Sequence, residues 1–392
     1  MKLIIVLLSS LFVVQNCAAQ DNNSIAITPI AGINISTASQ EKLKGNFYGI
    51  EGSYQISMAH YDADWVRMLH VKSVSIAATY IDVQNLTRNG VQSTKGIIGN
   101  MYSLSSRLNI SLWNSGSTRL LISPGLGLAY VTQTFYTNKN FVFGSHVNAV
   151  LQLGAKMETS IGPSTSLQFG VNVQHYSNAC TQMPNNGINT LLATLGVVQQ
   201  FSSKGPTHIH HSQDSVTRHS FEFGIGAGRR DVVKTGIFKN PAIPGQWFYY
   251  DTTGIVRKTR SNLYQIGMYA GYNYRLNPVI GLKAGSDVVY YTHPFTYDNF
   301  LNTYQSSFSS YDHFSVGLSA GVDIWLGRFA VTGTYGRYVH FNSLLAEHGY
   351  WTGGIKYHVL PWLALNTKVY WHGGQSHYAN FGVVFSSKKV FH

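Results

Sequence analysis

The sequence predicts an all-β protein, an antiparallel β-barrel of the outer membrane of a Gram-negative bacterium, and three observations support this. Charged residues are only 11% of the chain, where about 25% is usual for soluble proteins. Tyrosine and glycine are abundant, with 25 and 38 residues among 392. After the N-terminal segment, no apolar run approaches the about 20 residues that a membrane-spanning helix needs. This composition is typical of a barrel that crosses the membrane with strands.

The N-terminal segment has the features of an export signal. Lys2 precedes the apolar run 3–14, and the small residues Ala18 and Ala19 follow at the positions that a signal peptidase reads. We therefore expect residues 1–19 to be a signal peptide. Cys17 also raises the alternative of a lipid anchor, but the small residue expected just before a lipidated cysteine is missing. The mature chain would keep one cysteine, Cys180, and could form no intrachain disulfide.

Alternation of apolar and polar residues predicts the strands. Within residues 146–158 one face would carry Val147, Ala149, Leu151, Leu153, Ala155 and Met157, and the other His146, Asn148, Gln152, Lys156 and Glu158. Residues 263–275 alternate in the same way. A period of two fits either a sandwich or a barrel. Because a soluble sandwich would need more charge on its polar face, we expect a barrel with apolar residues outward and polar residues inward.

The strand-like segments fall into two sets. Eight lie between about residues 24 and 201 and eight between about 219 and 386, and the sets end alike, in LGVVQQFSSK and FGVVFSSK. We predict two tandem eight-stranded barrels, residues 20–203 and 219–392, joined by a polar linker at 204–218. One sixteen-stranded barrel is the alternative. Short periplasmic turns and long outer loops would make the odd strands run outward, although residues 58–72 are long for a periplasmic turn.

The stretch HYSNACTQMPNNGIN, residues 175–189, is the candidate active site. Strand parity puts His175 and Ser177 on the lipid-facing side of the barrel at its outer end. A hairpin that folds near Gln182 would bring Asn189 opposite His175. Polar groups that face lipid are costly unless they have a function. A serine beside a histidine, with a third group to orient the imidazole, is the arrangement of an acyl-transfer nucleophile, and the ester available in an outer leaflet is lipopolysaccharide.

The run His175-Tyr176-Ser177-Asn178-Ala179, followed by Pro184-Asn185 and Gly187-Ile188, resembles the signature of the lipid A 3-O-deacylase (acyloxyacyl hydrolase) family. The resemblance covers roughly residues 22–201. It implies an eight-stranded outer-membrane barrel that removes a 3-linked acyl chain from the lipid A of lipopolysaccharide, with neither a metal nor another cofactor. It also implies site roles: Ser177 as nucleophile, His175 as base, and Asn178 with the backbone N–H of Cys180 as oxyanion donors. We further expect Asn185, in the same stretch, to bind substrate.

Two positions depart from the family pattern. Asn189 stands where an acid is expected, and Cys180 where glycine is expected. An asparagine oxygen can still orient the histidine, but it gives no charge to stabilise the imidazolium, and the analogous change in a serine protease costs about 10⁴ in turnover. A non-catalytic structural or lipopolysaccharide-binding barrel is therefore the alternative to a hydrolase.

Other polar features are interpreted as structural or as aids to binding. The net charge of +12 would suit nucleic acid, but an exported barrel meets none. Arg229 and Arg230 begin a long loop and could bind lipid A phosphates or simply be solvated. The histidines at 208, 210 and 211 have spacing for zinc, yet a solvated tract is the preferred interpretation. GIGAGR at 224–229 is followed by no helix, so its glycines are better explained by strand curvature than by phosphate binding.

The second half is expected to have no catalytic site. Strand parity sends His372 inward, and Gly374 stands two residues later, where a nucleophile would be needed. The letters HYAN at 377–380 imitate the motif of the first half, but alanine replaces the serine.

Overall fold

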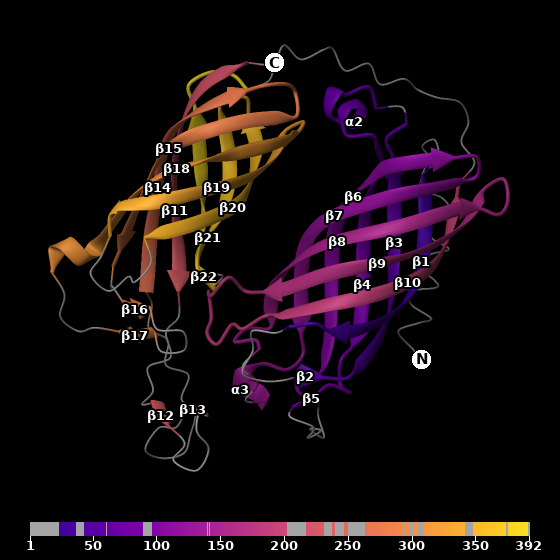
Figure 1. Ribbon diagram of the computed structural model, residues 1–392, viewed down its shortest axis with the longest axis horizontal. Helices are drawn as coiled ribbons and strands as arrows, with labels where there is room; N and C mark the ends of the chain where they lie inside the picture. The colour runs from indigo at the N-terminus through magenta and orange to yellow at the C-terminus, as the bar shows by residue number, and fades with distance from the viewer. Residues whose placement is uncertain are drawn as a thin grey trace. The chain divides into compact units, whose positions relative to one another are not determined.

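The computed structural model describes residues 23–36, 43–59, 61–88, 96–138, 140, 142–201, 217–230, 237–239, 247–249, 263–292, 295–297, 302–304, 309–341, 348–373 and 375–390 (Figure 1). The predicted signal peptide lies outside these residues, as does the predicted linker apart from its last two residues. The histidines at 208, 210 and 211 lie outside them too.

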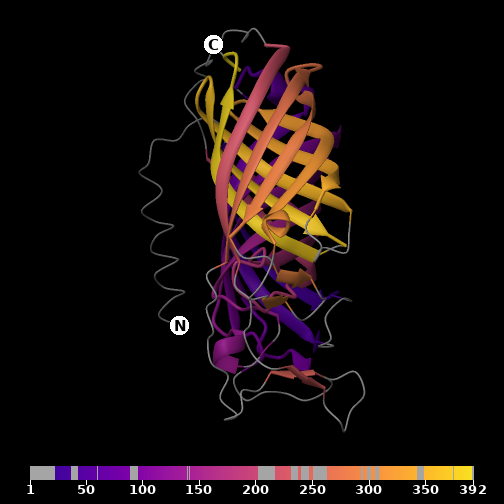
Figure 2. The ribbon, with the colours of Figure 1, turned by 90° about the vertical axis from the view of Figure 1, so that its left-hand side faces the viewer.

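The first barrel is a closed antiparallel sheet of eight strands, shown in indigo to magenta in Figures 1 and 2. Its strands are β1 (Ser24–Asn34), β3 (Asn46–Ser57), β4 (Val71–Asp82), β6 (Asn100–Ser115), β7 (Thr118–Val131), β8 (Val147–Ser160), β9 (Thr165–Ser177) and β10 (Ile188–Gln200). Each strand pairs with its neighbours in sequence, and β1 closes the barrel against β10. The closing ladder runs from Ser24 opposite Gln200 to Asn34 opposite Thr190.

The second barrel repeats this topology with eight further strands. They are β11 (His219–Arg230), β14 (Leu263–Arg275), β15 (Ile280–Tyr291), β18 (Phe314–Leu326), β19 (Phe329–His340), β20 (Gly349–Leu360), β21 (Leu363–His372) and β22 (Gln375–Ser386). Strand β11 closes the barrel against β22, from Glu222 opposite Ser386 to Ala227 opposite Phe381. Because each set of eight strands closes on itself, two tandem barrels are confirmed and the sixteen-stranded alternative is wrong.

Short elements occupy the connections. They are α2 (Asp64–Met68), α3 (Phe135–Asn138), the 3₁₀ helix η2 (Ser310–His313), and the paired short strands β2 (Leu43–Lys44) with β5 (Thr87–Arg88), β12 (Ile237–Lys239) with β13 (Trp247–Tyr249) and β16 (Phe295–Tyr297) with β17 (Asn302–Tyr304). Among the described residues, no helix is long and apolar enough to cross a membrane.

Side chains alternate along the strands as the sequence predicts. On β8 the apolar Val147, Leu151 and Leu153 are more than half exposed, whereas Gln152 and Glu158 on the other face are buried. This pattern places apolar side chains on the outer wall and polar ones in the lumen, as in barrels that face lipid.

Several charged groups in the lumens form ion pairs, because an isolated buried charge would be costly. In the first barrel Arg107 donates to Glu51. In the second, Lys356 Nζ lies 2.7 Å from Glu222 Oε1 and 2.6 Å from Asp323 Oδ2. Such pairs fill the interior of a small barrel and join strands that are not adjacent in the sheet, such as β6 with β3 and β20 with β18.

The glycines of the 224–229 run allow close backbone approach. A Cβ at Gly226 would lie 2.2 Å from Asn380 Oδ1 on β22. A Cβ at Gly228 would lie 2.3 Å from the carbonyl oxygen of Ala379. The run lies on strand β11, so these glycines serve the contact between β11 and β22.

The connection between β3 and β4 is long because it is folded. It contains helix α2 (Figure 1), and Val66 of that helix forms a small apolar cluster with Met58 and Val71. The connections at the same end of the barrel, 116–117 and 161–164, are short turns. Residues 58–70 are therefore a folded connection at an end of the barrel whose other connections are short turns.

Candidate active site

The β9–β10 hairpin carries the candidate site. The ladder places Asn189 directly opposite His175, and Ile188 opposite Tyr176. His175 and Ser177 lie two residues apart on the outward face of β9, and both are half-buried, whereas Tyr176 between them is fully buried. The period of the strand thus brings histidine, serine and asparagine side chains to one face of the barrel wall.

The imidazole of His175 is held by Asn189. His175 Nδ1 and Asn189 Oδ1 are 2.7 Å apart. Because a carbonyl oxygen only accepts hydrogen bonds, Nδ1 is the donor of this pair, and the neutral tautomer that fits it has its lone pair on Nε2. The backbone of Asn189 is fixed as well: its N–H donates to Ser36 Oγ at 2.7 Å, and its carbonyl accepts from the N–H of Ile35 at 2.9 Å. This arrangement fixes the orientation of the imidazole.

The hydroxyl of Ser177 is held by Asn185. Asn185 Nδ2 donates to Ser177 Oγ at 2.9 Å, and the N–H of Ala179 lies 3.2 Å from the same oxygen. Asn185 Oδ1 accepts the N–H of Asn178 at 3.0 Å, which fixes the plane of the amide. Asn185, expected to contact substrate, therefore contacts the candidate nucleophile itself.

The side chain of Asn178 fixes the loop. Its Nδ2 donates to Ser145 Oγ at 2.9 Å and to the carbonyl oxygen of Gln182 at 2.8 Å. The residue is only 6% exposed. Both of the protons that the resemblance assigns to an oxyanion are thus used to hold the β7–β8 and β9–β10 loops together.

Cys180 lies in a left-handed turn. Its φ is +62°, and that of the preceding Ala179 is +51°. Glycine adopts this region at no steric cost, whereas other residues pay about 1–2 kcal/mol. The local geometry explains why the family pattern has glycine here and shows that the turn forms with cysteine in its place.

The β7–β8 loop, residues 132–146, supports the site, and the sequence did not reveal this. Tyr136 Oη donates to the carbonyl oxygen of Met183 at 2.9 Å, and the N–H of Gly187 donates to the Val142 carbonyl at 3.1 Å. A Cβ at Gly144 would lie 2.4 Å from the Gln182 carbonyl oxygen, so the two loops are in close contact. No periodic pattern marks such loop contacts in a sequence.

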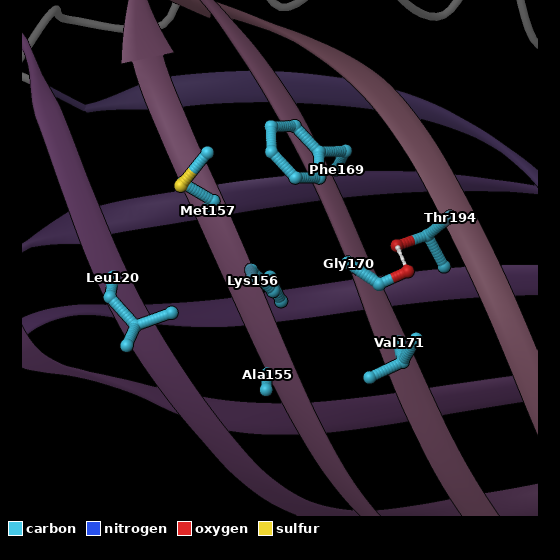
Figure 3. A pocket seen from close by; sticks show the side chains of 8 residues that line it. All are labelled: Leu120, Ala155, Lys156, Met157, Phe169, Gly170, Val171 and Thr194. Atoms are coloured by element: carbon cyan, nitrogen blue, oxygen red, sulfur yellow. Dashed lines mark hydrogen bonds between the residues drawn. The ribbon is translucent and has the colours of Figure 1, made fainter.

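A pocket with a mostly apolar lining lies on the wall of the first barrel (Figure 3). It has a volume of about 440 Å³ and is lined by Leu120, Ala155, Lys156, Met157, Phe169, Gly170, Val171 and Thr194. Phe169 and Val171 share the outward face of β9 with His175. At about 3.4 Å per residue along a strand, they lie roughly 14–20 Å from the His175 position.

The remaining candidates belong to the second barrel. Arg230 is 2% exposed and donates to the carbonyl oxygen of His377, so its guanidinium belongs to the interior of that barrel rather than to a loop surface. Arg229 precedes it on the outward face of β11. His372 is 1% exposed, with Nε2 2.9 Å from Tyr338 Oη. His372 is thus enclosed inside its barrel, whereas His175 is half-buried on the outward face of β9.

Family comparisons match both barrels. Residues 48–198 match the model of lipid A 3-O-deacylase (PagL), and residues 244–389 match that of acyloxyacyl hydrolase, C-terminal domain. Among solved structures, the outer membrane enzyme PagL is similar at 21% identity and a TM-score of 0.31, over 44% of this chain and 97% of that chain. Neisserial surface protein A is similar at 11% identity and a TM-score of 0.31, over 46% and 97%. No curated protein matches the sequence.

Proposed function

Because residues 48–198 and 244–389 make this chain a member of the lipid A 3-O-deacylase (PagL) and acyloxyacyl hydrolase family, we propose that its first barrel is a serine esterase acting on lipid A. The protein is a hydrolase of carboxylic esters, as its family is. The substrate is lipopolysaccharide in the outer leaflet, and the bond cleaved is the ester of an acyl chain. Residues 20–203 form the catalytic domain of this proposal, and residues 219–392, after the linker 204–218, have no catalytic site of their own.

One observation carries the serine mechanism. His175 and Ser177 lie on one outward face of β9, and Asn189 Oδ1, 2.7 Å from His175 Nδ1, directs the lone pair of Nε2 away from the hairpin partner. A nucleophile, a base and a group that orients the base are the three parts of an acyl-transfer site. Their place on the lipid-facing wall suits a substrate that stays embedded in the membrane.

The chemistry follows in two steps. The Ser177 hydroxyl, which donates to Asn185 Oδ1 at 3.3 Å in the structure, turns to His175 Nε2, which takes its proton while Oγ attacks the acyl carbonyl carbon. The ester bond breaks, the sugar oxygen leaves with the proton from His175, and the acyl chain remains on Ser177. Water, deprotonated by His175, then releases the fatty acid. The apolar face of β9 and the pocket that it helps to line offer the acyl chain a path along the barrel wall.

Covalent labelling tests the nucleophile. A fluorophosphonate with a long alkyl chain should label the purified full-length protein once, on the peptide that contains Ser177. Labelling should be lost in Ser177→Ala and should be strongly slowed in His175→Gln, because the hydroxyl then lacks its base. If the wild-type protein deacylates lipid A without labelling at Ser177, the serine mechanism is wrong.

A further inference from the structure

Two donors converge on the candidate nucleophile. Asn185 Nδ2 lies 2.9 Å from Ser177 Oγ, and the backbone nitrogen of Ala179 lies 3.2 Å from it. Both come from the β9–β10 loop that follows the strand carrying the serine. Donors gathered around an attacking oxygen are also close to the oxygen of the carbonyl that it attacks, because the two oxygens become bonded to one carbon.

The neighbouring Asn178 does not offer its amide in the same way. Its Nδ2 donates to Ser145 Oγ at 2.9 Å and to the Gln182 carbonyl at 2.8 Å. Turning that amide toward a substrate would break both hydrogen bonds at a residue that is only 6% exposed. Leaving the buried partners of Asn178 unsatisfied would be unfavourable.

We propose that Asn185, together with the N–H of Ala179, stabilises the oxyanion of the tetrahedral intermediate, and that Asn178 is a positioning residue for the loop. This inference rests on the proposed function of the site. When Oγ attacks, the carbonyl π electrons move to the substrate oxygen while the Ser177 proton goes to His175. Asn185 Nδ2 then shifts its hydrogen bond from Oγ to the adjacent, newly charged oxygen.

The surroundings of Asn185 suit a fixed donor. Its Oδ1 accepts the N–H of Asn178 at 3.0 Å, so the amide cannot turn without losing a hydrogen bond. Asn185 is half-buried at the edge of the site rather than enclosed by it. A donor that is oriented before reaction costs no reorganisation when charge develops, and removing one such donor typically lowers kcat about 10²–10³-fold.

Three full-length variants test the assignment. Asn185→Asp keeps the size and the acceptor of the side chain but removes the donor, and Asn185→Ala removes both. We expect kcat on purified lipid A to fall about 10²–10³-fold in each, with little change in KM. Asn186→Ala, next in the chain and half-buried in the same loop, is the matched control and should keep the wild-type rate.

A binding measurement separates catalysis from loop structure. An alkyl boronic acid that forms a tetrahedral adduct with Ser177 should bind Asn185→Ala more weakly by a factor comparable to the loss in kcat. A non-cleavable ether analogue of lipid A should bind this variant as it binds the wild type. Asn178→Ala should instead lower the thermal midpoint and weaken both ligands alike, and Ser145→Ala should reproduce that behaviour because it removes the partner of Asn178.

Clear results would overturn the inference. If Asn185→Ala keeps kcat while Ser177→Ala is inactive, the serine mechanism stands and the role of Asn185 is wrong. If Asn178→Ala selectively loses affinity for the boronic acid, Asn178 is the oxyanion donor. If Ser177→Ala itself still deacylates lipid A, the failure lies in the proposed function.

Discussion

In the proposed mechanism Asn189 orients the imidazole of His175 with a neutral amide, and we expect this to limit the rate. The 2.7 Å contact with His175 Nδ1 fixes the tautomer and the ring, but it adds no negative charge beside the imidazolium that forms during reaction. In a serine protease, exchanging the acid for an amide at the equivalent place costs about 10⁴ in turnover. We expect the missing negative charge to account for part of such a loss of turnover in this protein, because Asn189 already orients the imidazole of His175.

Restoring the charge should therefore accelerate the reaction. Asn189→Asp keeps the length of the side chain, and we expect kcat on lipid A to rise at least about tenfold. Asn189→Leu, similar in size but without an acceptor, should lower kcat because His175 loses its partner. Steady-state rates of the three proteins check this. Equal rates in wild type and Asn189→Leu would mean that another group orients His175.

The left-handed turn at Ala179 and Cys180 stores strain that can be relieved. Ala179 has a φ of +51°. Ala179→Gly should raise the free energy of unfolding by about 1 kcal/mol, since the left-handed strain removed exceeds the extra entropy of glycine in the unfolded chain. Urea titration of the protein in lipid vesicles measures it. A decrease of similar size would show that the turn is not strained.

Some of these residues were predictable and others were not. The strict period of β9 fixes the face of His175 and Ser177, and the hairpin ladder then fixes Asn189 opposite His175. The partner of Asn178 was not predictable, because Ser145 lies 33 residues earlier, in another loop. Loops carry no period, so sequence alone could suggest Asn178 only as a member of a motif.

The β7–β8 and β9–β10 loops pack against each other and together support the candidate site. Gly144 in the β7–β8 loop has no room for a side chain, since a Cβ would lie 2.4 Å from the Gln182 carbonyl oxygen and 2.6 Å from the Met183 carbonyl carbon. The β9–β10 loop must move if this space is filled. Asn185, on that loop, would then lose its place at Ser177.

Filling this space should impair activity without unfolding the barrel. We expect Gly144→Ala to lower kcat more than tenfold, because displacement of about 1 Å in a catalytic group can cost about 10²-fold. Gly162→Ala, in the β8–β9 turn, is the control, as a Cβ at that position would have nothing within 4 Å. The change of gel mobility on heating reports whether both barrels are folded. Wild-type kcat in Gly144→Ala would show that the loops do not position the site.

The connection between β3 and β4 shows what strand periodicity cannot reveal. Its helix α2 has five residues, too few for a recognisable helical period, and an isolated helix of that length is unstable. It forms because Val66 packs with Met58 and Val71. The sequence therefore predicted the strands on either side, but it did not predict the helix in the connection between them.

The whole molecule consists of two closed barrels, of which only the first carries the proposed chemistry. The similar ends of the two halves predicted this division, and each barrel closes through its own first and last strands. What remained hidden is the pairing inside the second lumen, where Lys368 contacts Asp287 and Tyr350 Oη donates to the same carboxylate at 2.8 Å. These contacts join residues far apart in sequence.

The second barrel should contribute no base to the reaction. His372 is enclosed in its lumen, with Nε2 2.9 Å from Tyr338 Oη. His372→Gln in the full-length protein should keep the wild-type rate of lipid A deacylation, whereas His175→Gln should lose nearly all of it. The two substitutions are chemically the same, and they differ in which barrel carries the histidine. Loss of activity in both would place a catalytic function in the second barrel.

The central claim is that Ser177 cleaves an acyl chain from lipid A, and the mass of lipid A in living cells tests it most directly. Outer membranes would be prepared from cells that lack the gene and carry either the wild-type protein or Ser177→Ala, at equal levels of folded barrel. The account predicts that the wild type converts lipid A to a species lighter by one acyl chain and that Ser177→Ala leaves it intact. Identical lipid A in both strains, whether intact or deacylated, would contradict it.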